Sequence, residues 1–190
     1  MNPKMGRECY VCKSLFPSFV VTHEGKTDEV LRLYSEDMSM LVFVLYGDIS
    51  LSISSPYSYE NKIIEKRQFF LSPLGEESVI TTLSDESKLL IYKFNQDAFY
   101  CVRHFLCQLG SLSNKFPTQN LGVLYLNDSL FEYLKSLTQL LKSKKYCSHY
   151  YDMMIEEIII YLNEFYSRKE LSSLFSPILG QDSDFRSFIY

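Results

Sequence analysis

The sequence contains no tryptophan, three histidines, seven glycines and six prolines among 190 residues. So little glycine and proline excludes a collagen-like or low-complexity chain. Hydrophobic residues make up 46% and charged residues 22%, which is typical of a globular chain. A chain of this length can bury enough surface to fold without disulfide bonds. No apolar run approaches the ~20 residues of a membrane helix, so we expect no membrane span.

An excess of positive charge is also missing. Lysine and arginine number 19 against 23 acidic residues, and residues 1–123 and 124–190 each have a net charge of -2. A chain that binds nucleic acid phosphates usually has a basic region, so direct DNA binding is disfavoured. The N-terminus has no apolar core of a secretory signal, which favours the cytoplasm and reduced thiols for the five cysteines.

Sequence motifs of common enzyme classes are absent. The chain has no GxGxxG, GxxxxGK[ST], GxSxG or HExxH motif, so nucleotide binding, serine-hydrolase and zinc-protease chemistry lose their usual support. No set of catalytic residues can be named. We therefore predict that the chain is not an enzyme and that it has no cofactor.

Two groups of cysteines could bind a metal. Cys9 and Cys12 form a CxxC motif, but a structural zinc site needs four ligands and the second half-site is missing. Cys101, His104 and Cys107 have helical spacing, so they could lie on one face of a helix. Their neighbours are mostly apolar, which favours buried thiols beside a partly exposed histidine. We expect no metal at either place.

Residues 15–94 have the pattern of short β-strands separated by turns. Residues 41–46 form an apolar run of strand length, and Ile49, Leu51 and Ile53 then alternate with serines. Gly47 and Asp48 between them predict a hairpin, because glycine reaches positive φ at low cost. Further strands are predicted at 68–71, 78–83 and 89–94. Many short strands at regular spacing indicate a sandwich or a barrel.

After Asn95 the apolar residues recur every three or four positions, which predicts amphipathic helices near residues 99–109, 129–142 and 155–165. Ser129 with Glu132, and Ser167 with Glu170, have the spacing of N-terminal capping boxes. A last helix begins near residue 182 and is unfinished at Tyr190. We therefore expect the natural protein to continue beyond this residue.

The second of these helices carries a leucine stripe with heptad-like steps of four and three. Such a stripe is typical either of a subunit interface or of packing on the chain's own barrel. We predict that it is a dimer interface, formed by Leu130, Leu134, Leu137 and Leu141.

Residues 147–190 resemble a known family. They are similar to the segment that precedes the DNA-binding helix-turn-helix pair in AraC-type bacterial transcription regulators. The residues that carry the resemblance are Glu157, Ile158, Phe165, Tyr166, Lys169, Glu170, Leu171, Leu174, Phe175, Pro177, Ile178, Leu179, Asp182, Asp184 and Phe185.

The β-rich half resembles the cupin-like barrel of such regulators. Metal-binding cupins have a PxGxxH element, but Ser78 stands in the place of its histidine, and the HxH motif is absent. The resemblance implies an α+β fold, a cupin-like β-barrel (double-stranded β-helix) followed by C-terminal helices. It divides the chain into a sensor region, residues 1–96, and a helical dimerisation and linker region, residues 97–190.

The same resemblance implies a function and partners. The chain would be the effector-sensing and dimerisation domain of a transcription regulator, with an unidentified small molecule inside the barrel. It would form a homodimer and reach DNA only through a C-terminal domain that this chain lacks. The alternative is a metal-free cupin-fold enzyme or a small-molecule binding protein.

Overall fold

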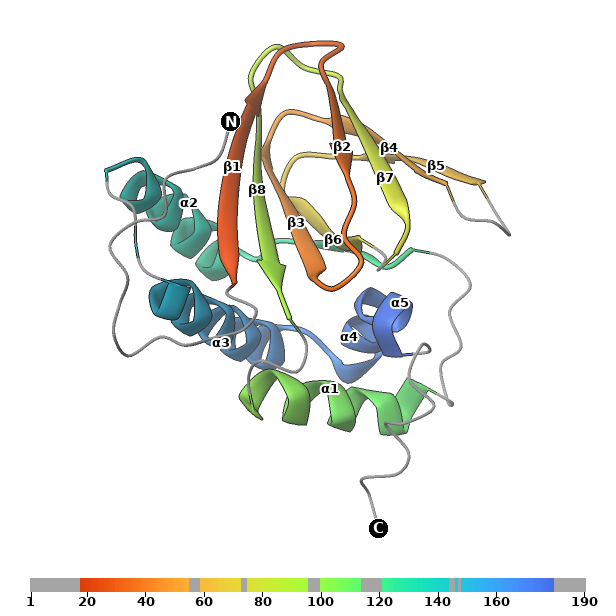
Figure 1. Ribbon diagram of the computed structural model, residues 1–190, viewed down its shortest axis with the longest axis vertical. Helices are drawn as coiled ribbons and strands as arrows, with labels where there is room; N and C mark the ends of the chain where they lie inside the picture. The colour runs from red at the N-terminus through yellow and green to blue at the C-terminus, as the bar shows by residue number, and fades with distance from the viewer. Residues whose placement is uncertain are drawn as a thin grey trace.

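The computed structural model describes residues 18–54, 59–72, 75–95, 100–113, 121–143, 146 and 148–179. Two β-sheets lie together, and the helices gather at one side of them (Figure 1). The strands are β1 (Phe19–Gly25), β2 (Val30–Leu33), β3 (Ser39–Tyr46), β4 (Ile49–Ser54), β5 (Tyr59–Ile64), β6 (Gln68–Ser72), β7 (Glu77–Thr82), β8 (Ser87–Phe94) and β9 (Val123–Tyr125). The helices are α1 (Tyr100–Ser113), α2 (Asp128–Ser143), α3 (Ser148–Phe165), α4 (Arg168–Leu174) and α5 (Ser176–Leu179).

The strands form a two-sheet antiparallel β-sandwich. The first sheet has the order β1-β8-β3-β6-β9 and the second the order β2-β7-β4-β5. Each strand pairing in both sheets is antiparallel. The chain crosses between the sheets several times, so neither sheet is a continuous segment of sequence. A β-sandwich with several helices confirms the coarse fold prediction.

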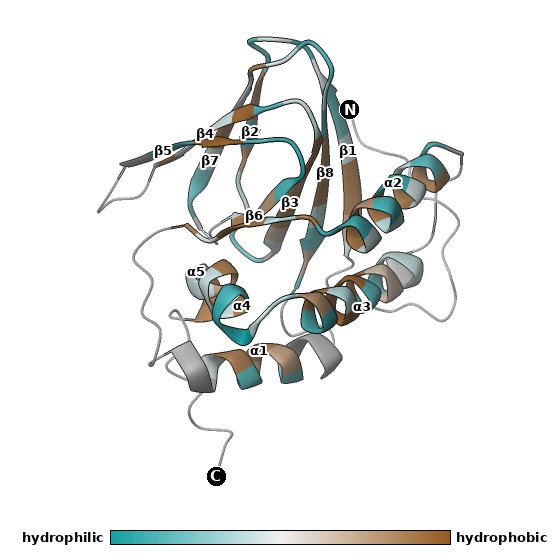
Figure 2. Cartoon of the chain, turned by 180° about the vertical axis from the view of Figure 1, so that it is seen from behind, coloured by the Kyte–Doolittle hydropathy of each residue, from teal (hydrophilic) through white to brown (hydrophobic). Residues whose placement is uncertain are grey.

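Strand β3 is buried on both faces. Met40, Val42 and Val44 belong to the core between the two sheets. Leu41 and Phe43 point the other way and belong to the core between the first sheet and the helices. This explains why the apolar run is continuous, because a strand covered on both sides has no polar face. Figure 2 shows hydrophobic residues along β3 and β8 and on parts of the helices.

The predicted hairpin at Gly47 and Asp48 is wrong. Strand β3 pairs with β6 and β8, whereas β4 pairs with β5 and β7 in the other sheet. Gly47 has a φ of 70°, as a tight turn requires. The turn therefore carries the chain from one sheet to the other. The alternation in β4 is confirmed, because Ile49, Leu51 and Ile53 are buried between the sheets.

The two predicted capping boxes have different outcomes. Ser167 and Glu170 form a capping box at the start of α4, with both reciprocal hydrogen bonds present. The box predicted for Ser129 and Glu132 is absent, because α2 begins one residue earlier, at Asp128. The side chain of Asn127 accepts a 2.7 Å hydrogen bond from the Leu130 N–H in its place. Glu132 instead pairs with Lys135 at 3.2 Å.

Strand β9 was missed by the sequence analysis, since three residues are too few to show an alternation. It pairs with β6, so residues of the helical half complete the first sheet. Among the described residues, no helix is long and apolar enough to cross a membrane. The expected helix at 182–190 lies outside the described residues.

Gly47 provides a test of this sheet-to-sheet turn. We expect Gly47→Ala to destabilise the domain by about 2–4 kcal/mol, from positive φ together with overpacking. The added Cβ would lie 2.6 Å from the Ser87 Oγ and 2.9 Å from its Cα. Gly75 has a similar φ of 73° but no atom within 4 Å of an added Cβ, so Gly75→Ala is the matched control and should cost only about 1 kcal/mol. Urea denaturation of both variants measures the difference, and equal losses would contradict a packed turn.

Candidate functional site

The leucine stripe of α2 lies in the core of its own chain. Leu130 and Leu134 are 0% exposed and Leu137 is 3% exposed. Leu141 is half-buried and packs against the same core. In this single chain, three of the four predicted interface residues therefore present no surface to a partner. The amphipathic pattern was read correctly, but its apolar side chains belong to the core that the first sheet shares with the helices.

The cysteine and histidine groups do not form a recognisable site in the described part of the chain. Cys107 is a half-buried free thiol, and the exposed His104 lies 2.8 Å from the side-chain nitrogen of Gln108, one turn along α1. The side chain of Cys101 lies outside the described residues, and so do Cys9 and Cys12. Among the described residues, no group of three His, Cys, Asp or Glu side chains could hold a metal.

Ser78, which stands where metal-binding cupins have histidine, lies in the interior. It is fully buried on β7, and its hydroxyl forms a 2.8 Å hydrogen bond with that of Ser72 on β6. The pair satisfies two polar groups that burial would otherwise leave without partners.

The space between the described strands is filled by side chains. The buried residues of this core are 0% to 8% exposed, and they include Met40, Phe70 and Ile80. A ligand between these strands would have to displace close-packed side chains, which costs free energy. Two clefts lined by described residues lie outside the sandwich.

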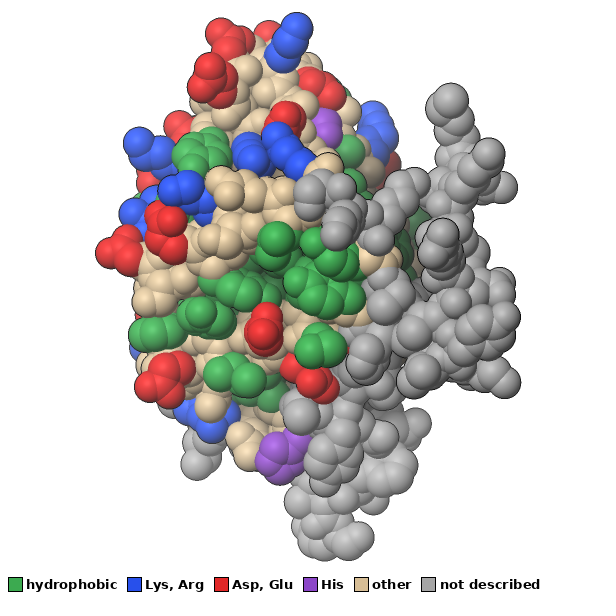
Figure 3. Space-filling view, turned by 90° about the vertical axis from the view of Figure 1, so that its left-hand side faces the viewer, with side chains coloured by type: hydrophobic (Ala, Val, Ile, Leu, Met, Phe, Trp, Pro, Cys, Tyr) green, Lys and Arg blue, Asp and Glu red, His purple; other side chains and the backbone are tan. Residues whose placement is uncertain are grey.

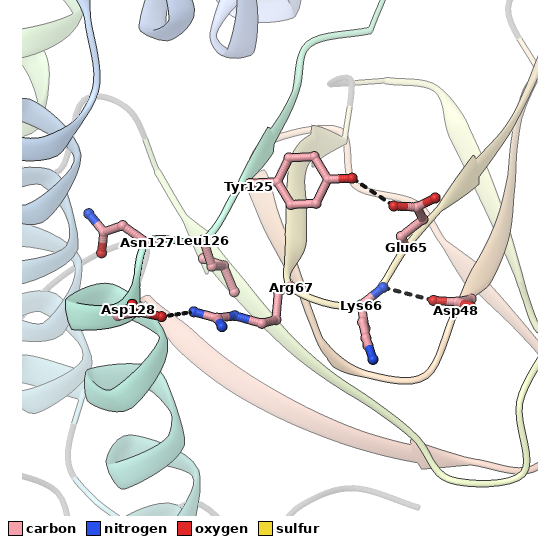
Figure 4. Close-up of a pocket in the computed structure, with 8 residues that line it drawn as sticks. All are labelled: Asp48, Glu65, Lys66, Arg67, Tyr125, Leu126, Asn127 and Asp128. Atoms are coloured by element: carbon pink, nitrogen blue, oxygen red, sulfur yellow. Dashed lines mark hydrogen bonds and ion pairs between the residues drawn. The ribbon is translucent and has the colours of Figure 1, made fainter.

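The larger cleft lies between the β5–β6 turn and the start of α2 and has a volume of about 640 Å³. It is lined by Asp48, Glu65, Lys66, Arg67, Tyr125, Leu126, Asn127 and Asp128. Figure 4 shows Arg67 and Asp128 facing each other at one end, with Tyr125 and Glu65 paired at the other. This cleft is the candidate functional site, because charged groups from three separated segments meet there.

Arg67 is the central residue of this cleft. Its guanidinium forms an ion pair with Asp128 and lies 4.5 Å from the ring centroid of Phe131, one turn further along α2. Its Nε is buried and, among the described residues, has no hydrogen-bond partner. The guanidinium is therefore held from two directions while one of its donors is unused.

The backbone of Arg67 is in a left-handed conformation, with a φ of 63°. A non-glycine residue pays about 1–2 kcal/mol for this conformation, so its surroundings must hold it there. Its N–H donates to the Val44 carbonyl at 2.7 Å, and its own carbonyl accepts from the Leu126 N–H at 2.7 Å. These two hydrogen bonds fix the backbone position from which the Arg67 side chain extends.

The segment from Tyr125 to Asn127 joins the first sheet to α2 and forms one wall of the cleft. The Tyr166 hydroxyl, at the end of α3, donates to the Tyr125 carbonyl at 2.7 Å and accepts from the Asn127 N–H at 3.1 Å. Burial raises the pKa of Tyr166, so the hydroxyl stays protonated and can act in both ways. The cleft is thereby connected to both α2 and the α3–α4 junction.

Two further hydrogen bonds lie in the cleft, whereas the buried side-chain nitrogen of Asn127 has no partner among the described residues. The Tyr125 hydroxyl donates to Glu65 at 2.6 Å, and this bond to a carboxylate raises the pKa of Tyr125. The Lys66 N–H donates to the Asp48 carboxylate at 2.8 Å. Sequence analysis could not find this site, because Arg67 and Asp128 are 61 positions apart and no motif links them.

The smaller cleft, of about 470 Å³, is lined by Glu24, Gly25, Lys26, Tyr46, Asp85, Glu86, Ser87 and Lys88. Glu24 on β1 pairs with Lys142 of α2 at 2.6 Å and with Lys88 at 3.6 Å. Hydrogen bonding and charge attraction from Lys142, together with Lys88, lower the pKa of Glu24. The ion pair of Glu24 with Lys142 joins this cleft to the C-terminal end of α2.

Comparison with known proteins identifies the fold. No family model and no curated protein matches the sequence. ToxT from Vibrio cholerae O395, solved with (E)-4-(8-methylnaphthalen-1-yl)but-3-enoic acid bound, is 13% identical with a TM-score of 0.50, over 84% of this chain and 65% of its own. KdgF from a Halomonas species is 13% identical over 40% of this chain and 68% of its own, with a TM-score of 0.36. A mutant of Bacillus subtilis oxalate decarboxylase is 14% identical over 63% of this chain and 37% of its own, with a TM-score of 0.39.

These structures include cupin domains and an AraC-family regulator with a cupin-like domain. At such identities the likeness concerns the fold alone, and the chain spans less than two thirds of ToxT. The prediction that the chain is not an enzyme is wrong, because an enzymatic function is not excluded. The cupin neighbours include the enzymes KdgF and oxalate decarboxylase. These likenesses do not decide between a regulator and an enzyme.

The burial of the leucine stripe leads to a stability prediction. We expect Leu134→Glu combined with Leu137→Glu to abolish folding, because each buried, unpaired carboxylate costs several kcal/mol. Ile160→Glu is the control on α3, where the side chain is 67% exposed, and it should leave the fold intact. Circular dichroism and thermal unfolding measure both variants. A folded double variant would show that the two leucines are not core residues.

Proposed function

We propose that the chain is the effector-sensing and dimerisation domain of an AraC-type transcription regulator. In this proposal its sandwich is a cupin-type double-stranded β-helix, and a helix-turn-helix domain that binds DNA follows Tyr190. The protein works in the cytoplasm. The effector is a small molecule, and the domain senses it on behalf of the DNA-binding part.

The extent of the likeness to ToxT carries the proposal. The described strands up to β8 end at Phe94, halfway along the chain, so a match over 84% of the chain must include helices as well as strands. The resemblance of residues 147–190 to the regulator linker is independent support, since it rests on sequence. The capping box at Ser167 and the buried Leu171, Leu174 and Phe175 lie within that segment.

The helices provide a physical route from effector to DNA. Tyr166 contacts the wall of the larger cleft and lies two positions before α4, within the segment that would lead to the DNA-binding domain. An effector that binds one arrangement of these helices more tightly than another changes their populations. The DNA-binding modules would then be presented differently.

The homodimer in this proposal uses the outward face of the helical layer instead of the leucine stripe. Met153, Ile160 and Phe165 of α3 are 49% to 67% exposed, and Leu140 of α2 is 46% exposed. Figure 3 shows hydrophobic side chains gathered on this side of the molecule, with carboxylates among them. A second copy of the chain is the proposed occupant, because regulators of the resembled family present paired DNA-binding modules.

Stacked aromatic rings give this face a defined shape. Tyr133 of α2 stacks on Tyr161 of α3 with ring centroids 5.1 Å apart, and Tyr161 stacks on Phe165 at 6.0 Å. The Tyr133 hydroxyl donates to Glu157 at 2.6 Å. This bond satisfies a carboxylate that lies close to the apolar side chains.

DNA binding tests the proposed function. We expect the 190-residue chain not to shift duplex DNA, because each of its parts is acidic and phosphate contacts need cations. The natural protein, with the residues that follow Tyr190, should select specific sequences from a pool of genomic fragments. Gel-shift assays with both proteins measure this.

Several outcomes would contradict the proposal. One is a natural protein that ends at Tyr190, and another is an extended protein that selects no sequence. We expect a small molecule that mass spectrometry identifies in the native protein to remain chemically unchanged when it is incubated with the protein. Its conversion to a product would favour the cupin-fold enzyme.

Oligomeric state tests the proposed interface. We expect Met153→Glu combined with Ile160→Glu to give a folded monomer, because the added carboxylates are solvated in the monomer but repel each other across a two-fold contact. Light scattering measures mass and circular dichroism measures folding. Val30→Glu, at a 53% exposed position on β2, is the control and should remain dimeric. A dimer that survives the double variant would exclude this face.

A further inference from the structure

The cleft between the β5–β6 turn and α2 combines a fixed arginine, an exposed carboxylate and a donor that has no partner among the described residues. Arg67 is fixed by its backbone hydrogen bonds and by its contact with Phe131. Asp128, its ion-pair partner, has a side chain that is 92% exposed. An ion pair with so exposed a partner contributes little stability, so the carboxylate can leave at low cost.

We propose that this cleft binds a small organic carboxylate, which replaces the Asp128 carboxylate on Arg67. The proposal rests on the proposed function and names the site and chemical class of the effector. The guanidinium is a planar fork that binds carboxylates through two parallel N–H donors. Asp128 occupies the Nη2 end of this fork, and the buried Nε has no partner among the described residues. The side chain of Asp128 acts as an internal stand-in for the ligand.

The charges of the cleft disfavour a dianion more than a monoanion. Its lining contains three carboxylates, from Asp48, Glu65 and Asp128, against two cations, from Lys66 and Arg67. A carboxylate that exchanges with Asp128 on Arg67 restores the same local pairing. A phosphate dianion would bring a second negative charge to a site that is already net acidic, so it should bind more weakly.

Exchange at Arg67 would act directly on the helical layer. Asp128 is the first residue of α2, where a carboxylate interacts favourably with the helix dipole. The neighbouring wall of the cleft, Leu126 and Asn127, is bonded to Arg67 on one side and to Tyr166 on the other. Ligand binding therefore changes contacts at the joint between the first sheet and α2, with no need to enter the packed interior.

Titration with sodium acetate tests the proposal, with sodium chloride at equal ionic strength as the reference. The readouts are the NMR signal of the Arg67 Nε–H and the backbone amide signals of Leu126 and Leu130. We expect saturable shifts in the unchanged chain. Asp128→Asn removes the internal competitor and should lower the acetate dissociation constant about fivefold, whereas Arg67→Gln should abolish saturation.

Controls separate this site from general electrostatics. Glu132→Gln removes the same charge from the same helix, but its carboxylate pairs with Lys135, so the dissociation constant should change less than about twofold. Arg67→Lys keeps the positive charge without the planar fork and should bind acetate more weakly than the unchanged chain. Circular dichroism of each variant confirms folding. Equal affinities in the unchanged chain and Asp128→Asn, saturation in Arg67→Gln, or tighter phosphate than acetate binding would overturn the proposal.

A second assay distinguishes failure of the site from failure of the proposed function. In the natural protein, DNA binding that responds to a small molecule but is unaffected by Arg67→Gln would exclude this cleft and leave the regulator intact. Acetate binding with the expected variant pattern, in a protein that selects no DNA, would retain the site and exclude the regulator.

Discussion

The structure depends on the burial of the first sheet on both faces. Phe43, Phe69 and Tyr92 point from this sheet into the core shared with the helices, and all three are fully buried. Without the helical layer each large side chain would lose about 1.5–3 kcal/mol of burial free energy. The sandwich and the helices must therefore fold as a single cooperative unit, although their sequences have different periods. A ligand signal cannot simply detach the helices from the sheet.

Any rearrangement of the helices must then begin at polar joints, and α2 has one at each end. At its start, Arg67 pairs with Asp128, and at its end Lys142 pairs with Glu24 of β1. Both pairs are at least partly exposed, so they contribute little to stability and can break without exposing apolar surface. The apolar stripe of α2, from Leu130 to Leu137, holds the middle of the helix against the core. Small tilts of α2 about this fixed segment are therefore the movements that cost the least free energy.

Local chemistry explains which features could be predicted from the sequence. The strand at Ile49 and the capping box at Ser167 depend on residues within a few positions of one another, and both were predicted. The leucine stripe was recognised as a helix face, but the same pattern suits a core and an interface equally well. Which of the two it meets depends on the first sheet, whose strands are far away in sequence. The Gly47 turn was misread for the same reason, since a tight turn does not specify which strands its neighbours pair with.

The candidate site could not be predicted because it is assembled from distant segments. Arg67 closes one turn, Asp128 begins one helix, and the pairing of β6 with β9 brings the two segments together. In the sequence, a charged turn such as Glu65-Lys66-Arg67 predicts an exposed loop and nothing more. The positive φ of Arg67 is likewise invisible, because nothing in its residue type requires that conformation.

The size of the Arg67 interaction limits what such a site can do. A ligand changes a conformational equilibrium only by the difference between its affinities for the two states. An exposed ion pair is worth at most about 1 kcal/mol, whereas a change from 1:99 to 99:1 needs about 5.5 kcal/mol. Two such sites in a symmetric dimer would supply about 2 kcal/mol, which corresponds to a factor of about thirty. A protein that senses through this cleft is therefore suited to a graded response, and a complete switch would require the ligand to make further contacts with Leu126 or Tyr125 that differ between the two states.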